Sequence, residues 1–144
     1  MTRARRKKRK ASRSRARKAQ AWTLLSQIIR WSAADKNGWV RCVTCGKLDR
    51  VENMQAGHFI PAGRGNAVKW DRRNIHPQCP QCNIFKHGNL IEYYPWMLAR
   101  YGHKIIDDLR GLSAKPLKLS ISDYDGMVDD YREELAEIMR RRKS

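Results

Sequence analysis

Two Cys-x-x-Cys sequences constrain this chain more than any other feature, because together they contain all four of its cysteines. The first contains Cys42 and Cys45, and the second contains Cys79 and Cys82. Four thiolates at this spacing bind one zinc ion in a closed tetrahedral set, which is typical of structural zinc sites. Disulfides would require an oxidising compartment, and the chain has no apolar run typical of a signal peptide. We therefore expect structural Zn²⁺ to contribute on the order of 10 kcal/mol to folding of the segment between the pairs.

The residues around the cysteines predict a small finger of strands with one short helix. Alternation and turn residues predict strands over residues 39–42, 53–60 and 72–76, the last one broken by Pro77. Residues 61–71 are rich in glycine and polar side chains and are expected to form a loop. A short helix should follow over residues 79–88. The expected fold class is α+β, a zinc-stapled ββα finger packed with several α-helices.

Helices are expected on both sides of this finger. Residues 19–34 carry a broad apolar stripe that should dock on the finger. Further helices are expected near residues 93–101, with Pro95 in the first turn, and over residues 103–112. Ser122 and Asp123 are expected to cap the last helix. The apolar stripe of that helix fits intramolecular packing and a homodimer interface equally well.

Positive charge is concentrated at the beginning of the chain. The net charge is +17, and residues 1–18 contain eleven Lys or Arg and no acid. Such a segment cannot bury apolar surface, so we expect a disordered basic arm over residues 1–18, followed by a single domain over residues 19–144. A polyanionic partner is implied, and DNA is favoured over a membrane surface, a solubilising role or a transit peptide. The arm residues expected at DNA phosphates are Arg5, Arg6, Lys7, Lys8, Arg9 and Lys10.

His58 lies in the expected second strand and is the candidate general base. Phosphodiester hydrolysis needs a water molecule that loses its proton near neutral pH, and imidazole titrates in that range. A single histidine on a strand is more often a hydrogen-bonded core or surface residue. The catalytic interpretation of His58 therefore depends on its neighbours in the fold.

Asn83 and His87 strengthen that interpretation, because they lie four residues apart on the expected short helix. An amide oxygen and an imidazole on one helix face could hold one Mg²⁺ or Mn²⁺ ion, with positions left for phosphate and water. The alternative is that Asn83 caps or fills space and His87 is solvated. Asn74 could tie down the loop between the strands or orient the base. The basic residues that could contact phosphate near this site are Arg64, Arg72, Arg73 and Lys86.

These residues carry a resemblance to known nucleases. Gly57-His58, Asn74 and Cys79-x-x-Cys82-Asn83-x-x-Lys86 resemble the HNH (His-Asn-His, or His-Me finger) endonuclease motif with its zinc-binding cysteines. Three longer stretches are similar to the phage NinG (Rap) recombination proteins: Ala56-Gly57-His58-Phe59, Arg73-Asn74-Ile75-His76-x-Gln78-Cys79 and Cys82-Asn83-x-x-Lys86-x-Gly88-Asn89-Leu90. The similarity covers most of residues 40–140.

The resemblance implies a phage-encoded, metal-dependent endonuclease that acts on branched or recombining DNA in the cytoplasm of a bacterial host. It assigns water activation to His58, bracing of the hairpin to Asn74 and ion binding to Asn83. It also implies recombination proteins as partners, and it does not imply a membrane partner. The alternative function is a non-catalytic, zinc-dependent nucleic-acid-binding module.

One position departs from the HNH pattern. HNH enzymes usually carry an acid or a histidine just before the general base, where it binds the ion, and this chain has Gly57 there. The replacement ligand could come from His87, Asp49, Glu52 or water. If no residue replaces it, the binding-module interpretation is favoured.

Overall fold

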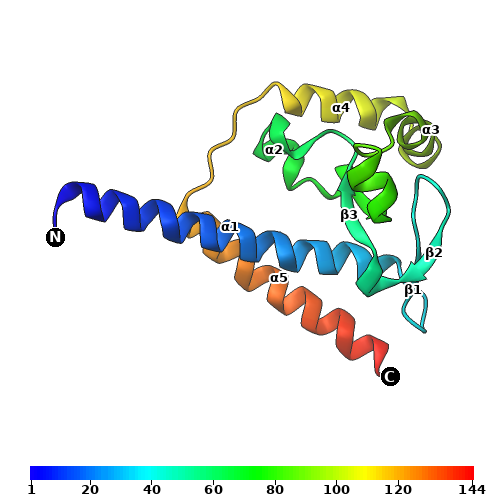
Figure 1. Cartoon of the computed structure of the whole chain (residues 1–144), viewed down its shortest axis with the longest axis horizontal. Helices are drawn as coiled ribbons and strands as arrows, with labels where there is room; N and C mark the ends of the chain where they lie inside the picture. Colours follow the sequence, from blue (N-terminus) through cyan, green and yellow to red (C-terminus); the bar gives the residue numbers. More distant parts are fainter. The chain divides into compact units, whose positions relative to one another are not determined.

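The computed structural model describes all 144 residues, which divide into two compact units. The first unit contains residues 1–28 and 119–144, and the second contains residues 29–118. Helix α1 (Arg3–Ala33) crosses the boundary between the two units (Figure 1). The two ends of the chain thus fold together in one unit, and the single domain expected over residues 19–144 stays a prediction. None of the helices combines the length and the apolar character that a membrane span requires.

The first unit is a pair of long helices, α1 and α5 (Ile121–Arg142). Arg17 on α1 forms an ion pair with Asp125 on α5, with the nitrogen and oxygen 3.0 Å apart. The buried side chains of this unit are Ala21, Leu25, Ile28, Tyr124 and Val128. The apolar stripe expected over residues 19–34 thus contributes mainly to this unit, and only residues from Ile29 onward belong to the second unit.

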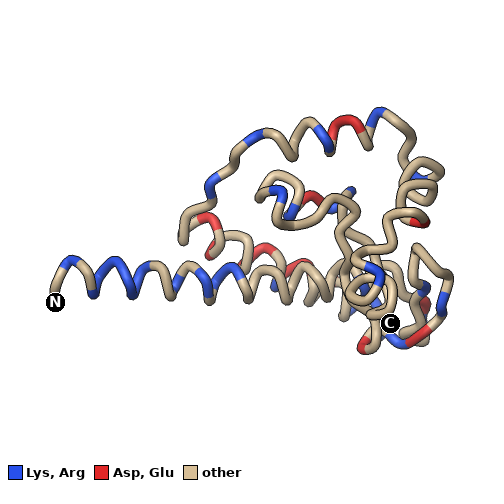
Figure 2. Tube along the Cα trace, turned by 45° about the horizontal axis from the view of Figure 1, so that its top comes forward, with Lys and Arg blue, Asp and Glu red and all other residues tan.

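The basic segment is helical from Arg3, in place of the expected disordered arm. Residues 1–18 contain no glycine or proline and are dominated by Arg, Lys and Ala, which all favour helix formation. The Lys and Arg residues of this segment, blue in Figure 2, lie along the first half of α1. Composition correctly predicts that this segment is exposed, but exposure does not prevent helix formation when a neighbouring helical segment extends it.

The second unit contains two small antiparallel sheets. Strand β1 (Trp39–Arg41) pairs with β2 (Leu48–Arg50), and β3 (Gln55–His58) pairs with β4 (Ile75–Gln78), with His58 opposite Ile75. Strand β2 was not expected from the sequence. The expected third strand is shifted, because residues 72–74 form a short 3₁₀ turn, η3 (Arg72–Asn74), and β4 continues through Pro77. A proline is tolerated there because its carbonyl accepts from Val43 N, at 3.0 Å, and so points away from β3, as the missing N–H of the same residue would.

Short helical segments complete this unit (Figure 1). Their bounds are η1 (Val51–Asn53), η2 (Ala62–Arg64), α2 (Asn66–Lys69), the π-helical η4 (Gln81–Phe85), α3 (Leu90–Tyr101) and α4 (His103–Ser113). Helix α3 begins before the expected Tyr93, so Pro95 lies inside it rather than in its first turn. In the first unit, α5 is capped by Ser120, whose hydroxyl accepts from Asp123 N, rather than by Ser122.

Two hydrophobic clusters form the core of the second unit. The first surrounds the cysteines and contains Val40, Cys42, Val51, Met54, Cys79 and Cys82. The second joins the end of β3 to α3 and α4 and contains Phe59, Tyr93, Met97, Ile106 and Leu109. The strands are only three or four residues long, and sheets of this size are marginal without further support. The architecture therefore consists of helices with small antiparallel sheets around a cysteine cluster, the expected α+β class.

Candidate functional site

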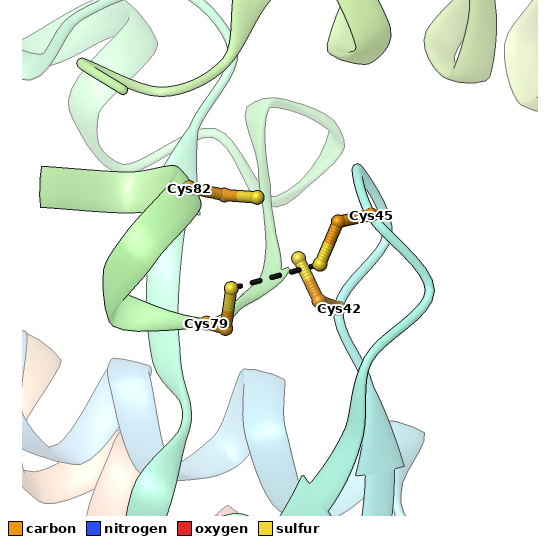
Figure 3. A group of neighbouring side chains, drawn as sticks. All are labelled: Cys42, Cys45, Cys79 and Cys82. Atoms are coloured by element: carbon orange, nitrogen blue, oxygen red, sulfur yellow. Dashed lines mark hydrogen bonds between the residues drawn. The ribbon is translucent and has the colours of Figure 1, made fainter. Parts of the chain in front are cut away.

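The four cysteines converge on one point between the two sheets (Figure 3). Cys42 and Cys45 lie in the turn after β1, Cys79 follows β4, and Cys82 lies in η4. Their sulfur atoms all lie within 4.8 Å of one another, and the Cys45 and Cys79 sulfurs are 3.7 Å apart. Zinc–sulfur bonds of ~2.3 Å in a tetrahedron separate sulfurs by about 3.8 Å. The four side chains therefore fit a structural zinc ion, and none of them forms a disulfide.

Thr44 supports the thiolate form that zinc binding requires. Its hydroxyl oxygen accepts a hydrogen bond from Gln78 Nε2 at 3.0 Å, so its own hydrogen can be donated to Cys42 Sγ, 3.3 Å away. Burial raises the pKa of Cys42, but the hydrogen bonds from Thr44 and from backbone N–H groups outweigh it and lower the pKa to about 6. The sequence gives no sign of this contribution from Thr44.

His58 is held by a backbone carbonyl. Its Nε2 atom lies 2.9 Å from the Lys69 carbonyl oxygen. A carbonyl can only accept, so Nε2 carries the hydrogen, and in the neutral ring Nδ1 is the nitrogen that accepts a proton. Burial lowers the pKa of His58; the hydrogen bond to the Lys69 carbonyl opposes this effect, and the positive charge of Lys69 adds to it. His58 is therefore neutral at pH 7, which is the form that a general base needs.

Asn74 is fully buried and ties down the loop between β3 and β4. Its Oδ1 accepts from Ile60 N at 2.7 Å, and its Nδ2 donates to the carbonyls of Ile60 and Val68, at 2.9 and 3.0 Å. Val68 directly precedes Lys69, whose carbonyl holds His58. The expectation that the Asn74 amide ties the loop is thus confirmed, and through the loop it also positions the segment that orients the imidazole.

The space beside Gly57 is filled by Gln78. A Cβ atom on Gly57 would lie 1.8 Å from Gln78 Oε1 and 2.6 Å from Gln78 Cδ. The Gln78 side chain cannot easily move, because it is fully buried and its Nε2 also donates to the Gly88 carbonyl at 2.9 Å. Gly57 thus permits a close approach of Gln78, and a carboxylate at position 57 has no room in this arrangement.

Replacing Gly57 by alanine should destabilise the second unit by about 1–3 kcal/mol, the usual cost of overpacking. In a background that also carries Gln78→Ala, the same substitution should cost less, because the clashing atoms are gone. Urea unfolding of the two single variants and the double variant measures this coupling. Gly63→Ala is the matched control, because a Cβ there meets no atom within 4 Å. Equal costs in the two backgrounds would contradict the close contact.

Asn83 and His87 do not share a helix face. The π-helical segment η4 ends at Phe85, and His87 has a left-handed backbone with φ of 51°. The argument from their four-residue spacing therefore fails for His87, which is exposed in the turn. The cause is the termination of the helix, because Gly88 and Asn89 also adopt positive φ and Gly88 N donates to the Cys82 carbonyl.

Asn83 is held against β3 by a hydrogen bond. Its Nδ2 donates to Gln55 Oε1 at 2.8 Å, which leaves Oδ1 as the atom that could bind an ion. The two acids proposed as replacement ligands have other partners. Asp49 accepts from Asn53 Nδ2 at 2.9 Å and pairs with Lys47, and Glu52 pairs with Arg50. Neither acid is brought to His58 or Asn83 by a contact in the structure.

The basic residues expected at phosphates differ in their surroundings. Arg73 donates two hydrogen bonds to the Asp71 carboxylate, at 3.0 and 2.7 Å. The negative charge of Asp71 therefore compensates the positive charge of Arg73. Arg64 and Lys86 are exposed and form no ion pair, and Arg72 is also exposed. In the first unit, the cavity between α1 and α5 has a volume of about 510 Å³ and is lined by the basic residues Arg6, Arg9, Lys10 and Arg13.

His76 is part of a buried hydrogen-bond chain that links α3 to β3. Tyr93 donates its hydroxyl hydrogen to the Gly57 carbonyl at 2.8 Å, so its oxygen accepts from His76 Nδ1 at 2.9 Å. His76 Nε2 is then the acceptor for the Tyr101 hydroxyl, at 2.7 Å. Burial lowers the pKa of His76 to about 4, and the positive charge of Arg100 adds to this effect. This series of hydrogen bonds therefore requires a neutral His76 imidazole. It extends to the carbonyl of Gly57, the residue before His58.

The free energy of unfolding should fall as the pH decreases from about 6.5 to 4, because the unfolded His76 binds a proton in this range and the folded one does not. The linkage relation sets an upper value of about 3 kcal/mol for this contribution, most of it lost by pH 4. Urea unfolding of wild type and His76→Gln at pH 7.5 and 5, with saturating zinc, measures the difference. His76→Gln should be less stable but less dependent on pH, whereas His103→Gln, at an exposed position, should behave like wild type. An unchanged pH dependence in His76→Gln would contradict this prediction.

Comparison with known proteins gives one family. The family model described as Bacteriophage Lambda NinG protein matches residues 1–141. Protein ninG of Escherichia phage lambda is 27% identical over 101 residues, which are 70% of this chain and 48% of the relative. Protein ninG of Salmonella phage P22 is 28% identical over 102 residues, covering 67% of this chain and 50% of the relative. The chain thus spans about half the length of these relatives, and no solved structure matches it.

Proposed function

Because this chain belongs to the NinG family, we propose that it is a metal-dependent endonuclease that cuts branched or recombining DNA with an HNH-type ββα finger. The observation that carries the proposal is the state of His58. A neutral imidazole whose Nε2–H is fixed on a backbone carbonyl has its basic Nδ1 set in one orientation. General-base catalysis needs such a group, positioned before the substrate arrives.

The other residues of the proposed finger have supporting roles. Asn74 positions the loop that carries the Lys69 carbonyl. Asn83 Oδ1 is the proposed protein ligand, and His87 remains a candidate second ligand from the turn. A hydrated Mg²⁺ or Mn²⁺ ion fits one or two protein ligands completed by phosphate oxygens and water. When bound, this ion would stabilise the charge that develops on the phosphate and on the leaving oxygen.

The charge distribution supports a DNA substrate. The exposed basic residues of α1 include all six arm residues expected at phosphates, Arg5, Arg6, Lys7, Lys8, Arg9 and Lys10. These six consecutive residues lie on helix α1 rather than in a disordered tail, so their side chains point to all sides of its first turns. Phosphate contacts from these residues would supply affinity without reading sequence.

The test is incubation of the purified protein with a four-way DNA junction and a linear duplex of the same sequence, with and without Mn²⁺. Cleavage of the junction only in the presence of the ion is the expected result. A second candidate function, a non-catalytic zinc-dependent nucleic-acid-binding module, is favoured by Gln78, which fills the space of the missing ligand. It gives salt-sensitive binding and no cleavage under any of these conditions.

A further inference from the structure

An apolar patch is exposed on the segment that follows Asn83. Residues 84–91 contain four of the eight large hydrophobic side chains that are exposed in the whole chain. Phe85 and Ile91 are 69% and 87% exposed, and Ile84 and Leu90 are 52% and 47% exposed. Single exposed apolar side chains are ordinary, but such a concentration indicates a binding surface.

Hydrogen bonds to residues of the cysteine cluster and to Gln78 hold the turn that carries the patch. Gly88 N donates to the Cys82 carbonyl, and Asn89 Nδ2 approaches Cys82 Sγ at 3.5 Å. The Gly88 carbonyl accepts from the buried Gln78. These bonds tie the turn to the cysteine cluster, so the apolar side chains are presented on a rigid support rather than on a loop that could fold over them.

Basic residues lie near the patch. Lys86 lies within it, and no acidic residue occurs between Arg72 and Ile91, although the exposed Glu92 follows directly. Leu90 also lines a cavity of about 420 Å³, together with Arg64, Arg110 and the aromatic residues Phe59 and Tyr94. An apolar centre with a basic rim is complementary to nucleic-acid bases flanked by phosphates.

We propose that Phe85, supported by Ile84 and Ile91, inserts at the branch point of a DNA junction, separates a base from its remaining stacking neighbour and packs against the exposed face of that base. The inference rests on the proposed function, because it places the branch point beside Asn83. A base at a branch has already lost one stacking neighbour, so separating it from the other costs less than in a continuous duplex. The patch therefore favours branched over linear DNA through contacts that do not depend on charge.

The experiment uses a four-way junction with 2-aminopurine, a base whose fluorescence rises on unstacking, at the branch point. Wild type and variants are added to it without Mg²⁺ or Mn²⁺, so no cleavage is needed. Phe85→Ala should lose more than half of the fluorescence rise and bind the junction about tenfold more weakly, in line with the loss of one stacking contact. Binding of linear duplex should change less than about twofold.

Leu48→Ala is the matched control, because Leu48 is also an exposed apolar residue (47%), and it lies on β2, away from residues 84–91. It should leave both signals unchanged, and equal zinc content and melting temperature show that each variant folds. An unchanged fluorescence rise with Phe85→Ala would overturn the proposal. So would a wild-type dimer that Phe85→Ala converts to a monomer while the fluorescence rise is kept, because the patch would then be a protein interface. Absence of cleavage in Mn²⁺ with the fluorescence result intact would refute the endonuclease proposal alone.

Discussion

Replacing Cys79 by serine should leave residues 29–118 without a stable fold at neutral pH. Cys79 is buried in the cluster that holds the two small sheets together, so its loss removes a zinc ligand and core packing at once. Structural zinc contributes about 10 kcal/mol or more in domains of this kind, which exceeds the stability that strands of three or four residues can supply. Elemental analysis should find no bound zinc ion, and the amide signals of these residues should lose their chemical-shift dispersion in NMR spectra.

Removal of the metal from wild type by a strong chelator should reproduce the same loss, and added zinc should restore the fold. Leu48→Ala serves as a control, because it alters the neighbouring hairpin without touching a thiol. A chelated protein that keeps the melting temperature of wild type would show that the cysteines are ordinary core residues.

His58→Ala should cut junction DNA about 10²–10⁴-fold more slowly than wild type, the usual effect of losing a general base. Its binding affinity and zinc content should be unchanged, because the ring is not among the cysteine ligands and contacts a backbone carbonyl. Single-turnover cleavage at saturating protein isolates this step. Added imidazole should restore part of the rate, which a purely structural role of the ring would not allow.

His103→Ala provides the comparison for this experiment, since His103 is an exposed histidine on α4 of the same unit. Its cleavage rate should match wild type. If His58→Ala cut as fast as His103→Ala, the assignment of the base would be wrong, and the neutral state of His58 would have only a structural meaning.

The residues whose positions depend on local rules are the ones that the sequence predicts well. Two Cys-x-x-Cys pairs can converge only if the intervening chain folds back, and the convergence follows from the chemistry of four sulfurs. The sequence leaves two roles open for Asn74, tying down a loop or orienting the base, and its buried amide makes three hydrogen bonds that tie the loop. The positions of β1, β3 and α4 follow from alternation and helical spacing to within a few residues.

The features that the sequence does not reveal depend on contacts between distant segments. Pro77 indicates the end of a strand, but β4 continues through it, and its carbonyl accepts a hydrogen bond from Val43 N in another turn. His87 fits the spacing of a helix, yet the three positive φ angles that end η4 also lead the chain toward α3. The partner of α1 cannot be predicted either, because an apolar stripe does not specify whether it packs on the finger or on α5.

The interlock of Gly57 and Gln78 restricts the order in which substitutions can accumulate during divergence. A larger side chain at position 57 is accommodated only after position 78 has become smaller, since the reverse order passes through an overpacked intermediate. The two sites are therefore epistatic, and a lineage that gains an acid beside His58 must first give up the Gln78 bonds to Thr44 and Gly88. Gain of a carboxylate would thus be coupled to loss of hydrogen bonds that hold the residues around the cysteine cluster.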